Sequence, residues 1–205
     1  GNYSEHSLKM MSAFMQLNKT SDKDLIYSML SSGNHLHDLD DIIHWMTSLK
    51  FKYELGVEKI GISLMNHWTY DGYSLHHESN KYFDVIGVRC EIGNREVVSW
   101  DQPMVRSAQK GLMGFLVKKI NGIYHFLVQA KLEAGNFDIV EMAPTVQCLT
   151  GNYRKGQNEY SIPYLEYFIN APKENVWYAT YQSEEGGRFF QEQNLNTIVE
   201  VGDEF

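Results

Sequence analysis

The chain has 205 residues, of which 43% are hydrophobic and 21% are charged, so it suits one folded domain and excludes a collagen, a coiled coil or a disordered chain. Lys and Arg number 18 against 26 Asp and Glu, which leaves a formal net charge of −8 at pH 7. An acidic chain lacks the basic face that nucleic acid or an anionic membrane requires. We therefore expect neither nucleic acid nor a membrane among its partners.

Targeting and redox features favour a cytoplasmic location. No apolar run approaches the roughly 20 residues of a membrane helix, and the N-terminal stretch lacks the apolar core of a signal peptide. The two cysteines, Cys90 and Cys148, match neither a zinc spacing nor a disulfide framework. We expect a cytoplasmic chain whose thiols are reduced.

Residues 1–56 are predicted to be helical. Apolar residues between positions 25 and 30 recur at helical spacing, and Gly33-Asn34 is a stop signal. Asp38 is placed to cap a second helix with an apolar side between positions 42 and 49. The stretch 35–44 is rich in His and Asp and suggests a metal site. Acidic residues in a first helical turn also complement the helix dipole, and we favour that interpretation.

After Gly56 the pattern becomes that of strands. Strands are predicted at 59–65, 81–92, 96–100, 138–142, 145–149, 176–182 and 197–201. Asn121-Gly122 between the β-rich runs 112–120 and 123–133 predicts a hairpin with a two-residue type I′ turn. A short helix is predicted at 164–170, and a helix or a turn at 188–194. We expect an α+β fold with a mixed, mostly antiparallel sheet and flanking helices, divided into a helical segment 1–56 and a domain 57–205.

The second strand of the hairpin divides its side chains between two faces by alternation. The even positions 124–132 are apolar or small and are predicted to face the core. The opposite face carries an imidazole, an amide, an ammonium and a carboxylate at His125, Gln129, Lys131 and Glu133. A solvated face with cross-strand ion pairs is the alternative. The row ends at the turn Gly135-Asn136, and because sites gather at loops, we favour a functional row.

Three further segments carry groups that bind ligands. Thr145, Gln147, Asn152 and Tyr153 can each hydrogen-bond a polyhydroxylated ligand, although turn chemistry explains this segment as well. Arg188 follows two glycines, and arginine binds phosphate in bidentate fashion. Trp100 and Gln102 offer a stacking ring and an amide, or simply a packed ring before a loop proline.

The motifs of several enzyme classes are absent from the sequence. It contains no GxGxxG before a helix, no P-loop, no G-x-S-x-G elbow and no HExxH. No Cys/His grouping fits zinc or a catalytic dyad. Chemistry that needs nicotinamide, zinc or a serine nucleophile is therefore not expected.

Five segments resemble the NDP-hexose 2,3-dehydratases of deoxysugar biosynthesis. They are LHHESNKYFDVIG (75–87), REVVSWDQP (95–103), GIYHFLVQAKLEAGN (122–136), APTVQCLTGNY (143–153) and SEEGGRFF (183–190), in the order of the family. The resemblance implies a Nudix-like fold that lacks the Nudix box, and hence no metal and no cofactor. Family chains typically carry two related copies of this domain and this chain carries one, so the resemblance implies a symmetric homodimer.

The resemblance also implies an activity. Water is removed across C2 and C3 of an NDP-4-keto-6-deoxyhexose, and a ketoreductase is expected to consume the unstable 3,4-diketo-2,6-dideoxy product. Glu133 or His125 is the expected base, and Lys131 is expected to polarise the C4 oxygen or bind phosphate. Tyr153 is the expected proton donor to the leaving hydroxyl. Substrate-binding residues are expected at His77, Trp100, Gln102, Gln129, Asn136, Thr145, Gln147, Asn152, Ser183, Glu184 and Arg188.

Two other classes of function remain open from the sequence. One is a non-catalytic module that binds a nucleotide sugar, in which a single copy kept the pocket and lost turnover. The other is an acidic, β-rich scaffold without a ligand. A nucleotide that raises the melting temperature would argue against the scaffold, because a ligand that binds only the folded state stabilises it.

Overall fold

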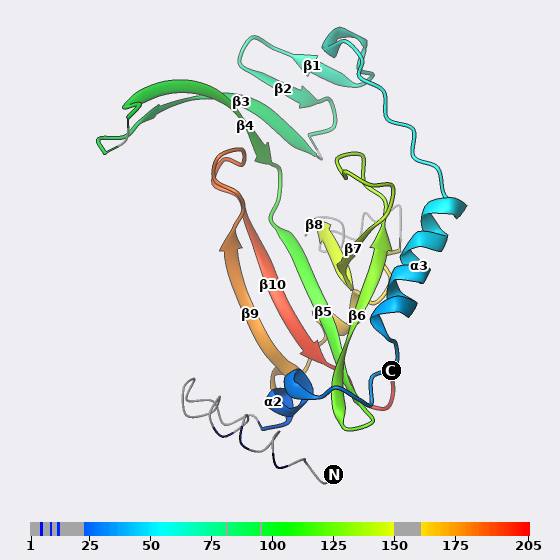
Figure 1. The fold of residues 1–205 in the computed structure, drawn as a ribbon. Helices are drawn as coiled ribbons and strands as arrows, with labels where there is room; N and C mark the ends of the chain where they lie inside the picture. Colours follow the sequence, from blue (N-terminus) through cyan, green and yellow to red (C-terminus); the bar gives the residue numbers. More distant parts are fainter. Residues whose placement is uncertain are drawn as a thin grey trace.

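The computed structural model describes residues 23–80, 82–94, 96–149 and 161–205, together with Glu5, Lys9 and Ser12. In this part of the chain, two sheets and a few short helices form an α+β fold (Figure 1), which confirms the predicted class. Among the described residues, eight pairs of strands are hydrogen-bonded, and all but one of these pairs are antiparallel. The Nudix-like likeness stays a prediction.

The two N-terminal helices that the structure describes are α2 (Lys23–Leu30) and α3 (Leu39–Lys52). As predicted, α3 begins after Asp38, whose backbone N–H donates to Asp41 Oδ2 at 3.1 Å. Ile26 of α2 is 2% exposed, and Ser28 Oγ accepts the backbone N–H of Tyr124 at 2.9 Å, so α2 is fastened to the larger sheet. No residue of α3 is buried.

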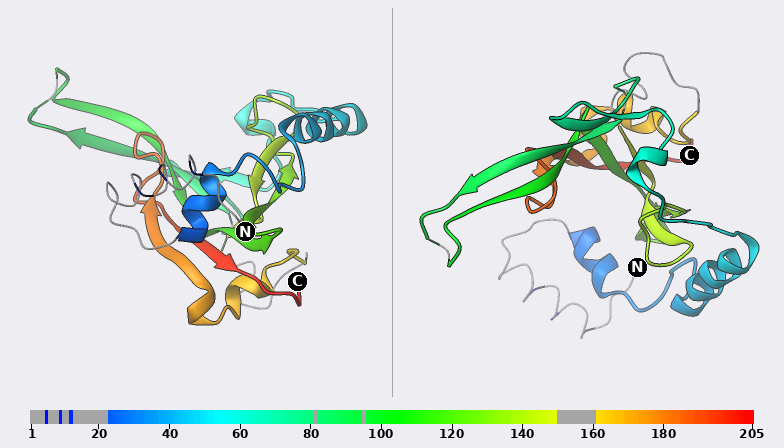
Figure 2. Two further views of the ribbon diagram at one scale, coloured as in Figure 1. Left: turned by 60° about the horizontal axis from the view of Figure 1, so that its bottom comes forward. Right: turned by 90° about the horizontal axis from the view of Figure 1, so that it is seen from above.

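The smaller sheet has four antiparallel strands in the order β1-β2-β3-β4. They are β1 (Trp68–Tyr70), β2 (Ser74–His77), β3 (Phe83–Glu91) and β4 (Ser99–Ser107). The β3–β4 hairpin projects away from the rest of the molecule (Figures 1 and 2). The predicted strand at 59–65 is wrong: the 3-10 turn η1 (Ile62–Leu64) lies there, because this alternating run has no partner strand to pair with.

The larger sheet runs in the order β7-β6-β5-β10-β9, and β8 pairs with β5 off this path. Its strands are β5 (Gly111–Ile120), β6 (Ile123–Lys131), β7 (Glu141–Pro144), β8 (Val146–Leu149), β9 (Val176–Ser183) and β10 (Gln193–Glu200). The one parallel pair is β5 with β10. The turn between β5 and β6 has φ of 52° at Asn121 and 85° at Gly122, which confirms the predicted hairpin.

The core lies on one face of the larger sheet, beneath α5 (Glu166–Ile169) and the C-terminal residues. The 3-10 turn η2 (Lys173–Asn175) leads from α5 to β9. Leu116, Val199 and Val201 form one buried cluster, and Leu127 packs against it. The face of β6 predicted to be the core is therefore the wrong one: Phe126 is 45% exposed and Leu132 is 38% exposed. The alternation of side chains between two faces was predicted correctly. Which face is buried depends on the side of the sheet that α5 covers, and the sequence of β6 alone does not reveal that side.

One edge of β5 is shared between two strands. Leu116–Ile120 pair with β6, whereas Gly111–Gly114 pair with β8. We call the point where β6 gives way to β8 along this edge the fork. Thr145, which precedes β8 and is 5% exposed, lies at the fork. Its hydroxyl accepts the backbone N–H of Leu116 at 2.9 Å and donates to the carbonyl of Leu127. Beyond the fork the end of β6 runs beside β7 instead of β5.

Candidate active site

A cavity of about 440 Å³ lies at the end of the larger sheet where β5 and β10 begin and β6, β8 and β9 end. The residues that line it, among those the structure describes, are Ser107, Gly111, Leu112, Met113, Lys131, Glu133, Gln147, Cys148, Leu149, Glu184, Phe189, Glu192 and Asn194. Four of the predicted site residues meet here, namely Lys131, Glu133, Gln147 and Glu184. Segments separated by tens of residues in sequence thus form one concave, polar site, the usual shape of a small-molecule site.

The cavity has an acidic balance. Lys131 Nζ lies 2.6 Å from Glu133 Oε1, and the two side chains are 26% and 46% exposed. Glu184 and Glu192 add two further carboxylates, and Lys131 supplies the one cation among the described lining residues. An ammonium beside an oxygen that develops negative charge stabilises it electrostatically. Lys131 is therefore suited to polarise a carbonyl oxygen in the cavity.

Cys148 also lines the cavity. Burial raises the pKa of its thiol to about 11, and the nearby Lys131 ammonium opposes that shift only in part. A thiol with so high a pKa is almost entirely protonated at neutral pH, so it is a poor nucleophile. Cys148 therefore shapes the cavity as a lining residue and is not a candidate nucleophile.

Glu184 is held by a network that the sequence did not reveal. Asn194, which is 6% exposed, donates from Nδ2 to Glu184 Oε1, and its Oδ1 accepts the backbone N–H of Gly111 at 2.7 Å. The backbone N–H of Glu184 donates to the carbonyl of Glu192 at 3.1 Å. Neither Gly111 nor Asn194 was predicted. Asn194 is one of several polar residues in β10, so the sequence does not single it out, and its partner lies 83 residues away.

Thr145 and Gln129 use their side chains within the protein. Both hydrogen bonds of the Thr145 hydroxyl go to the backbone at the fork. Gln129 Nε2 donates to the carbonyl of Pro144 at 2.9 Å and ties β6 to β7. Neither residue is among those that line the cavity. Each is therefore placed to shape the site, and the predicted contact of each with substrate stays a prediction.

His125 lies elsewhere, in a second cavity of about 490 Å³ between α3 and β6. Its Nε2 accepts the backbone N–H of Leu36 at 3.1 Å, and its Nδ1 lies 3.2 Å from the carbonyl of Ile123. These contacts define the neutral tautomer that carries its hydrogen on Nδ1. The structure therefore does not bring His125 together with Lys131 and Glu133, and His125 is better placed to fasten the segment before α3.

Trp100, Gln102 and Arg188 form a chain of contacts between β4 and the loop after β9. Trp100 Nε1 donates to Gln102 Oε1 at 2.6 Å, and Gln102 Nε2 donates to the carbonyl of Gly187 at 2.7 Å. Arg188 Nε lies 2.7 Å from Glu185 Oε2, and the Arg188 side chain is 79% exposed. The hydrogen bond and charge of Glu185 raise the pKa of Arg188. Arg188 is outside the cavity lining, but its neighbour Phe189 is part of it.

The other predicted residues have varied positions. His77 contacts the Tyr82 ring edge-on at 4.8 Å in the smaller sheet, away from the cavity lining. Asn136 lies in the turn after β6, with Nδ2 at 3.4 Å from the carbonyl of Lys131. Ser183 ends β9 next to Glu184. Asn152 and Tyr153 lie outside the described residues.

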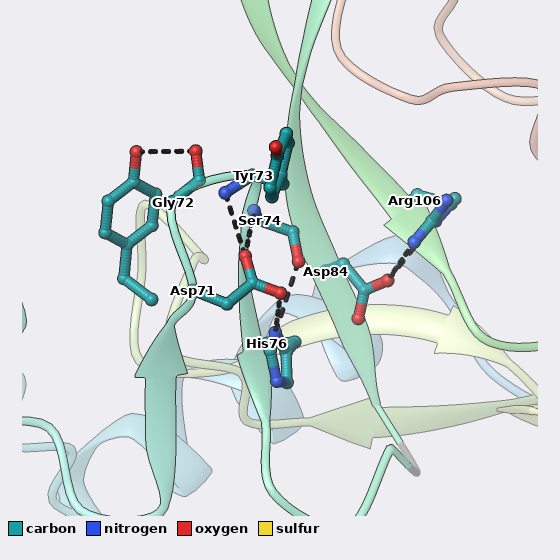
Figure 3. A network of polar contacts seen from close by, with 8 residues as sticks. Asp71, Gly72, Tyr73, Ser74, His76, Asp84 and Arg106 are labelled. Atoms are coloured by element: carbon teal, nitrogen blue, oxygen red, sulfur yellow. Dashed lines mark hydrogen bonds and ion pairs between the residues drawn. The ribbon is translucent and has the colours of Figure 1, made fainter.

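A polar network occupies the loop between β1 and β2 (Figure 3). Asp71 Oδ1 accepts the backbone N–H groups of Tyr73 and Ser74, both at 2.8 Å, and these bonds lower the pKa of Asp71. Ser74 Oγ and Asp71 Oδ2 both approach the same His76 nitrogen, Nδ1, at 3.2 and 3.9 Å. A catalytic triad needs the serine and the carboxylate on opposite ring nitrogens, so this arrangement is a turn network and not a triad.

The chain matches a family model described as NDP-hexose 2,3-dehydratase over residues 39–205. It is 38% identical over 176 residues to a dTDP-4-dehydro-6-deoxy-alpha-D-glucopyranose 2,3-dehydratase of Saccharopolyspora spinosa, covering 86% of this chain and 36% of the relative. It is 40% identical over 170 residues to an enzyme of the same name from Streptomyces violaceoruber, covering 82% of this chain and 38% of the relative.

The chain therefore belongs to the NDP-hexose 2,3-dehydratase family, which confirms the resemblance. It spans little more than a third of the length of the curated relatives it matches. Within the described residues, no helix is long and apolar enough to cross a membrane. In the same residues, no group of three or more His, Cys, Asp or Glu side chains is arranged to hold a metal ion.

Proposed function

We propose that this chain carries the reaction site of a nucleotide-sugar 2,3-dehydratase that acts on a dTDP-linked 4-keto-6-deoxyhexose. The observation that supports this most is the cavity in which Lys131 lies beside several carboxylates, in a chain of this family. The relatives are named as dehydratases of dTDP-4-dehydro-6-deoxy-alpha-D-glucopyranose. The product is a 3,4-diketo-2,6-dideoxy sugar.

The reaction needs a base, a group near the developing oxyanion and a proton for the leaving group. The C4 ketone acidifies the C3 hydrogen, so a carboxylate of the cavity removes this proton and an enolate forms with its charge on the C4 oxygen. Lys131 stabilises that charge. The C2–O bond then breaks, and the hydroxyl leaves as water. No electrons are gained or lost overall, so the step needs no redox partner.

The acidic balance of the cavity suits the sugar better than the diphosphate. Carboxylate oxygens accept hydrogen bonds from sugar hydroxyls but repel phosphate. Arg188 is proposed to bind the diphosphate at the rim, since it is exposed and adjoins Phe189 of the lining. It would exchange its ion pair with Glu185 for a bidentate contact with phosphate.

Tyr153 is retained as the proposed donor to the leaving hydroxyl. It follows Leu149, the last described residue of β8 and part of the cavity lining, by four positions. Replacing Tyr153 by Phe should slow elimination and leave exchange of the C3 hydrogen with solvent largely intact.

Removal of the Lys131 charge tests the reaction site. In the Lys131→Met variant, exchange of the C3 hydrogen of dTDP-4-keto-6-deoxyglucose with deuterium should fall by about 100-fold, the order seen when an oxyanion-stabilising group is lost. Lys119→Met is the matched control, because Lys119 pairs with Asp24 of α2 at 2.6 Å, away from the cavity. Equal exchange by wild type and Lys131→Met would contradict the proposed site.

A non-catalytic nucleotide-sugar-binding module is the second candidate. It requires the same polar cavity to hold the sugar of a nucleotide sugar without turnover. An assay coupled to a ketoreductase, the enzyme class expected to act next on the diketo product, separates the two. Product supports the dehydratase, whereas a dTDP-induced melting shift with neither product nor exchange supports the binding module.

We also propose that the chain forms a homodimer. Apolar side chains of the smaller sheet and of η1 are exposed, including Ile62 at 64%, Tyr70 at 69% and Tyr73 at 90%. They border a cavity of about 780 Å³ on one face of that sheet. Contiguous exposed apolar surface of this kind marks an interaction site. Light scattering at micromolar concentration should give twice the mass of the chain, and a monomer would contradict the proposal.

A further inference from the structure

The cavity holds two carboxylates in different environments. Glu133 Oε1 lies 2.6 Å from the Lys131 ammonium. Glu184 Oε1 instead accepts a hydrogen bond from the neutral amide of Asn194. The Glu133 carboxylate is thus engaged by the ammonium of the cavity, whereas the Glu184 carboxylate is oriented by a neutral amide. Of the two, Glu184 is the one that the protein aims without tying it to the Lys131 charge.

The orientation of the Asn194 amide follows from its surroundings. The backbone N–H of Gly111 donates to Asn194 Oδ1 at 2.7 Å, so that atom must be the amide oxygen. The amide nitrogen therefore faces Glu184 and can only donate to it. With 6% of its surface exposed, Asn194 has little room to turn. Glu184 thus receives its hydrogen bond in a fixed direction.

Gly111 allows this close approach. A Cβ atom added at Gly111 would overlap Asn194 Oδ1 and lie 3.0 Å from Asn194 Cγ. Residue 111 is also the first of β5, whose register with both β8 and β10 is set at this point. The absence of a side chain at Gly111 therefore lets its backbone N–H contact the Asn194 amide, which in turn contacts the Glu184 carboxylate.

We propose that Glu184 is the general base of this cavity and that Asn194 and Gly111 are its positioning residues. This assignment rests on the proposed dehydratase function and goes beyond it, since it selects Glu184 over Glu133. Glu184 takes the proton from C3, and the electron pair of the C–H bond forms the C3–C4 enolate with its charge on the C4 oxygen. That pair then forms the C2–C3 double bond as the C2–O bond breaks with its own pair, and the leaving hydroxide takes a proton from the donor to form water. The C3 enol tautomerises to the ketone by losing its hydroxyl proton and gaining one at C2, and Glu184 releases the C3 proton to solvent as the donor regains its own, so the net change is the loss of one water.

The charged and titratable groups around Glu184 support this role. Those that line the same cavity are Lys131, Glu133, Glu192 and the thiol of Cys148. Lys131 is engaged by Glu133, so the one cation among the described lining residues is paired with the other carboxylate. Glu184 therefore combines a fixed orientation with a place in the cavity wall outside that ion pair.

The first experiment compares Glu184→Gln with Glu133→Gln by exchange of the C3 hydrogen and by binding of dTDP. Glu184→Gln should reduce exchange by at least about 100-fold, as expected for loss of an acid–base group, and should leave the dissociation constant of dTDP within about threefold. Glu133→Gln should reduce exchange less. If Glu184→Gln exchanges at the wild-type rate, or loses less than Glu133→Gln, the assignment of the base is overturned.

The second experiment tests the positioning residues through a pH profile. Asn194→Asp keeps the shape and the acceptor for Gly111 but places a second carboxylate against Glu184, so the pH of half-maximal exchange should rise by about one unit or more. Gly111→Ala should lower exchange by displacing the amide. Thr180→Asp is the control, and it should leave the profile unchanged, because it adds the same charge at an exposed residue of β9 that does not line the cavity. An unshifted profile in Asn194→Asp would refute the positioning role.

The outcomes separate this assignment from the proposed function. A wild-type chain that binds dTDP without exchanging C3 hydrogen overturns both the dehydratase and the base. A wild-type chain that exchanges, together with a Glu184→Gln variant that still exchanges, overturns the base alone. Circular dichroism on every variant excludes loss of folding as the cause of a lower rate.

Discussion

Replacement of Thr145 by Val tests whether this threonine holds the fork of the larger sheet together. The hydroxyl bridges the backbone N–H of Leu116 and the carbonyl of Leu127, and Leu116 is 1% exposed. Valine keeps the shape of the side chain but leaves both backbone groups without this partner. Each buried polar group that loses its partner lowers the free energy of unfolding by about 1–3 kcal/mol. We expect a loss of at least about 2 kcal/mol, which corresponds to a melting temperature lower by about 4–8 °C for a chain of this size.

Thr145→Ser is the matched variant. It keeps the hydroxyl and loses one methyl group, so it should cost about 0.5–1.5 kcal/mol. Urea unfolding followed by circular dichroism measures both variants, and equal m-values allow their midpoints to be compared. If Thr145→Val is as stable as Thr145→Ser but binds dTDP more weakly, the hydroxyl serves the ligand, as the sequence suggested, and the structural role is refuted.

Three further predictions concern packing, thiol reactivity and pH. Gly114→Ala should destabilise by about 1–3 kcal/mol, because the new Cβ would overlap the ring of Phe168, and a urea midpoint equal to wild type would contradict this. Cys148 should be alkylated at pH 8 at least about 100-fold more slowly than a free cysteine, since its pKa of about 11 leaves little thiolate; mass spectrometry measures the rate. Lys50 lowers the pKa of Asp138 through their hydrogen bond, so this pair stabilises the fold above about pH 4 and the contribution is lost as pH falls further. Lys50→Met should therefore flatten the decline in melting temperature on acidification, and an unchanged decline would argue against it.

The helices and the central hairpin could be predicted because their signals are local. Asp38 caps α3 within three residues, and Asn121-Gly122 determines the turn between β5 and β6 by its own backbone preferences. The strand predicted at 59–65 failed for the opposite reason. Its alternation is as regular as that of a true strand, but a strand exists only where another strand supplies hydrogen-bond partners. β1 and β2, which are short, pair instead and were missed.

The candidate site was predictable only in part, since it depends on which distant segments meet. Lys131 and Glu133 share a face by alternation, so their proximity followed from the sequence. His125 shares the same alternation, but it lies six residues before Lys131 on an extended strand, about 20 Å away, and faces a different cavity. Asn194 was missed because its importance comes from Gly111, a residue that only the parallel pairing of β5 with β10 brings alongside.

The fork in the larger sheet explains why a polar cavity exists at this end of it. If β6 paired with β5 along its whole length, the residues after Leu127 would be opposite the first half of β5 and the space would be filled by paired strands. Instead β8 takes that edge from Gly111 to Gly114, and the end of β6 turns away beside β7. The separation of β6 from β8 thus leaves a cavity, which Lys131 and Glu133 line together with Gln147 and Cys148 of β8. A substitution that closes the fork should remove the cavity and its chemistry together, whereas Thr145→Ser, which keeps the bridge, should preserve both.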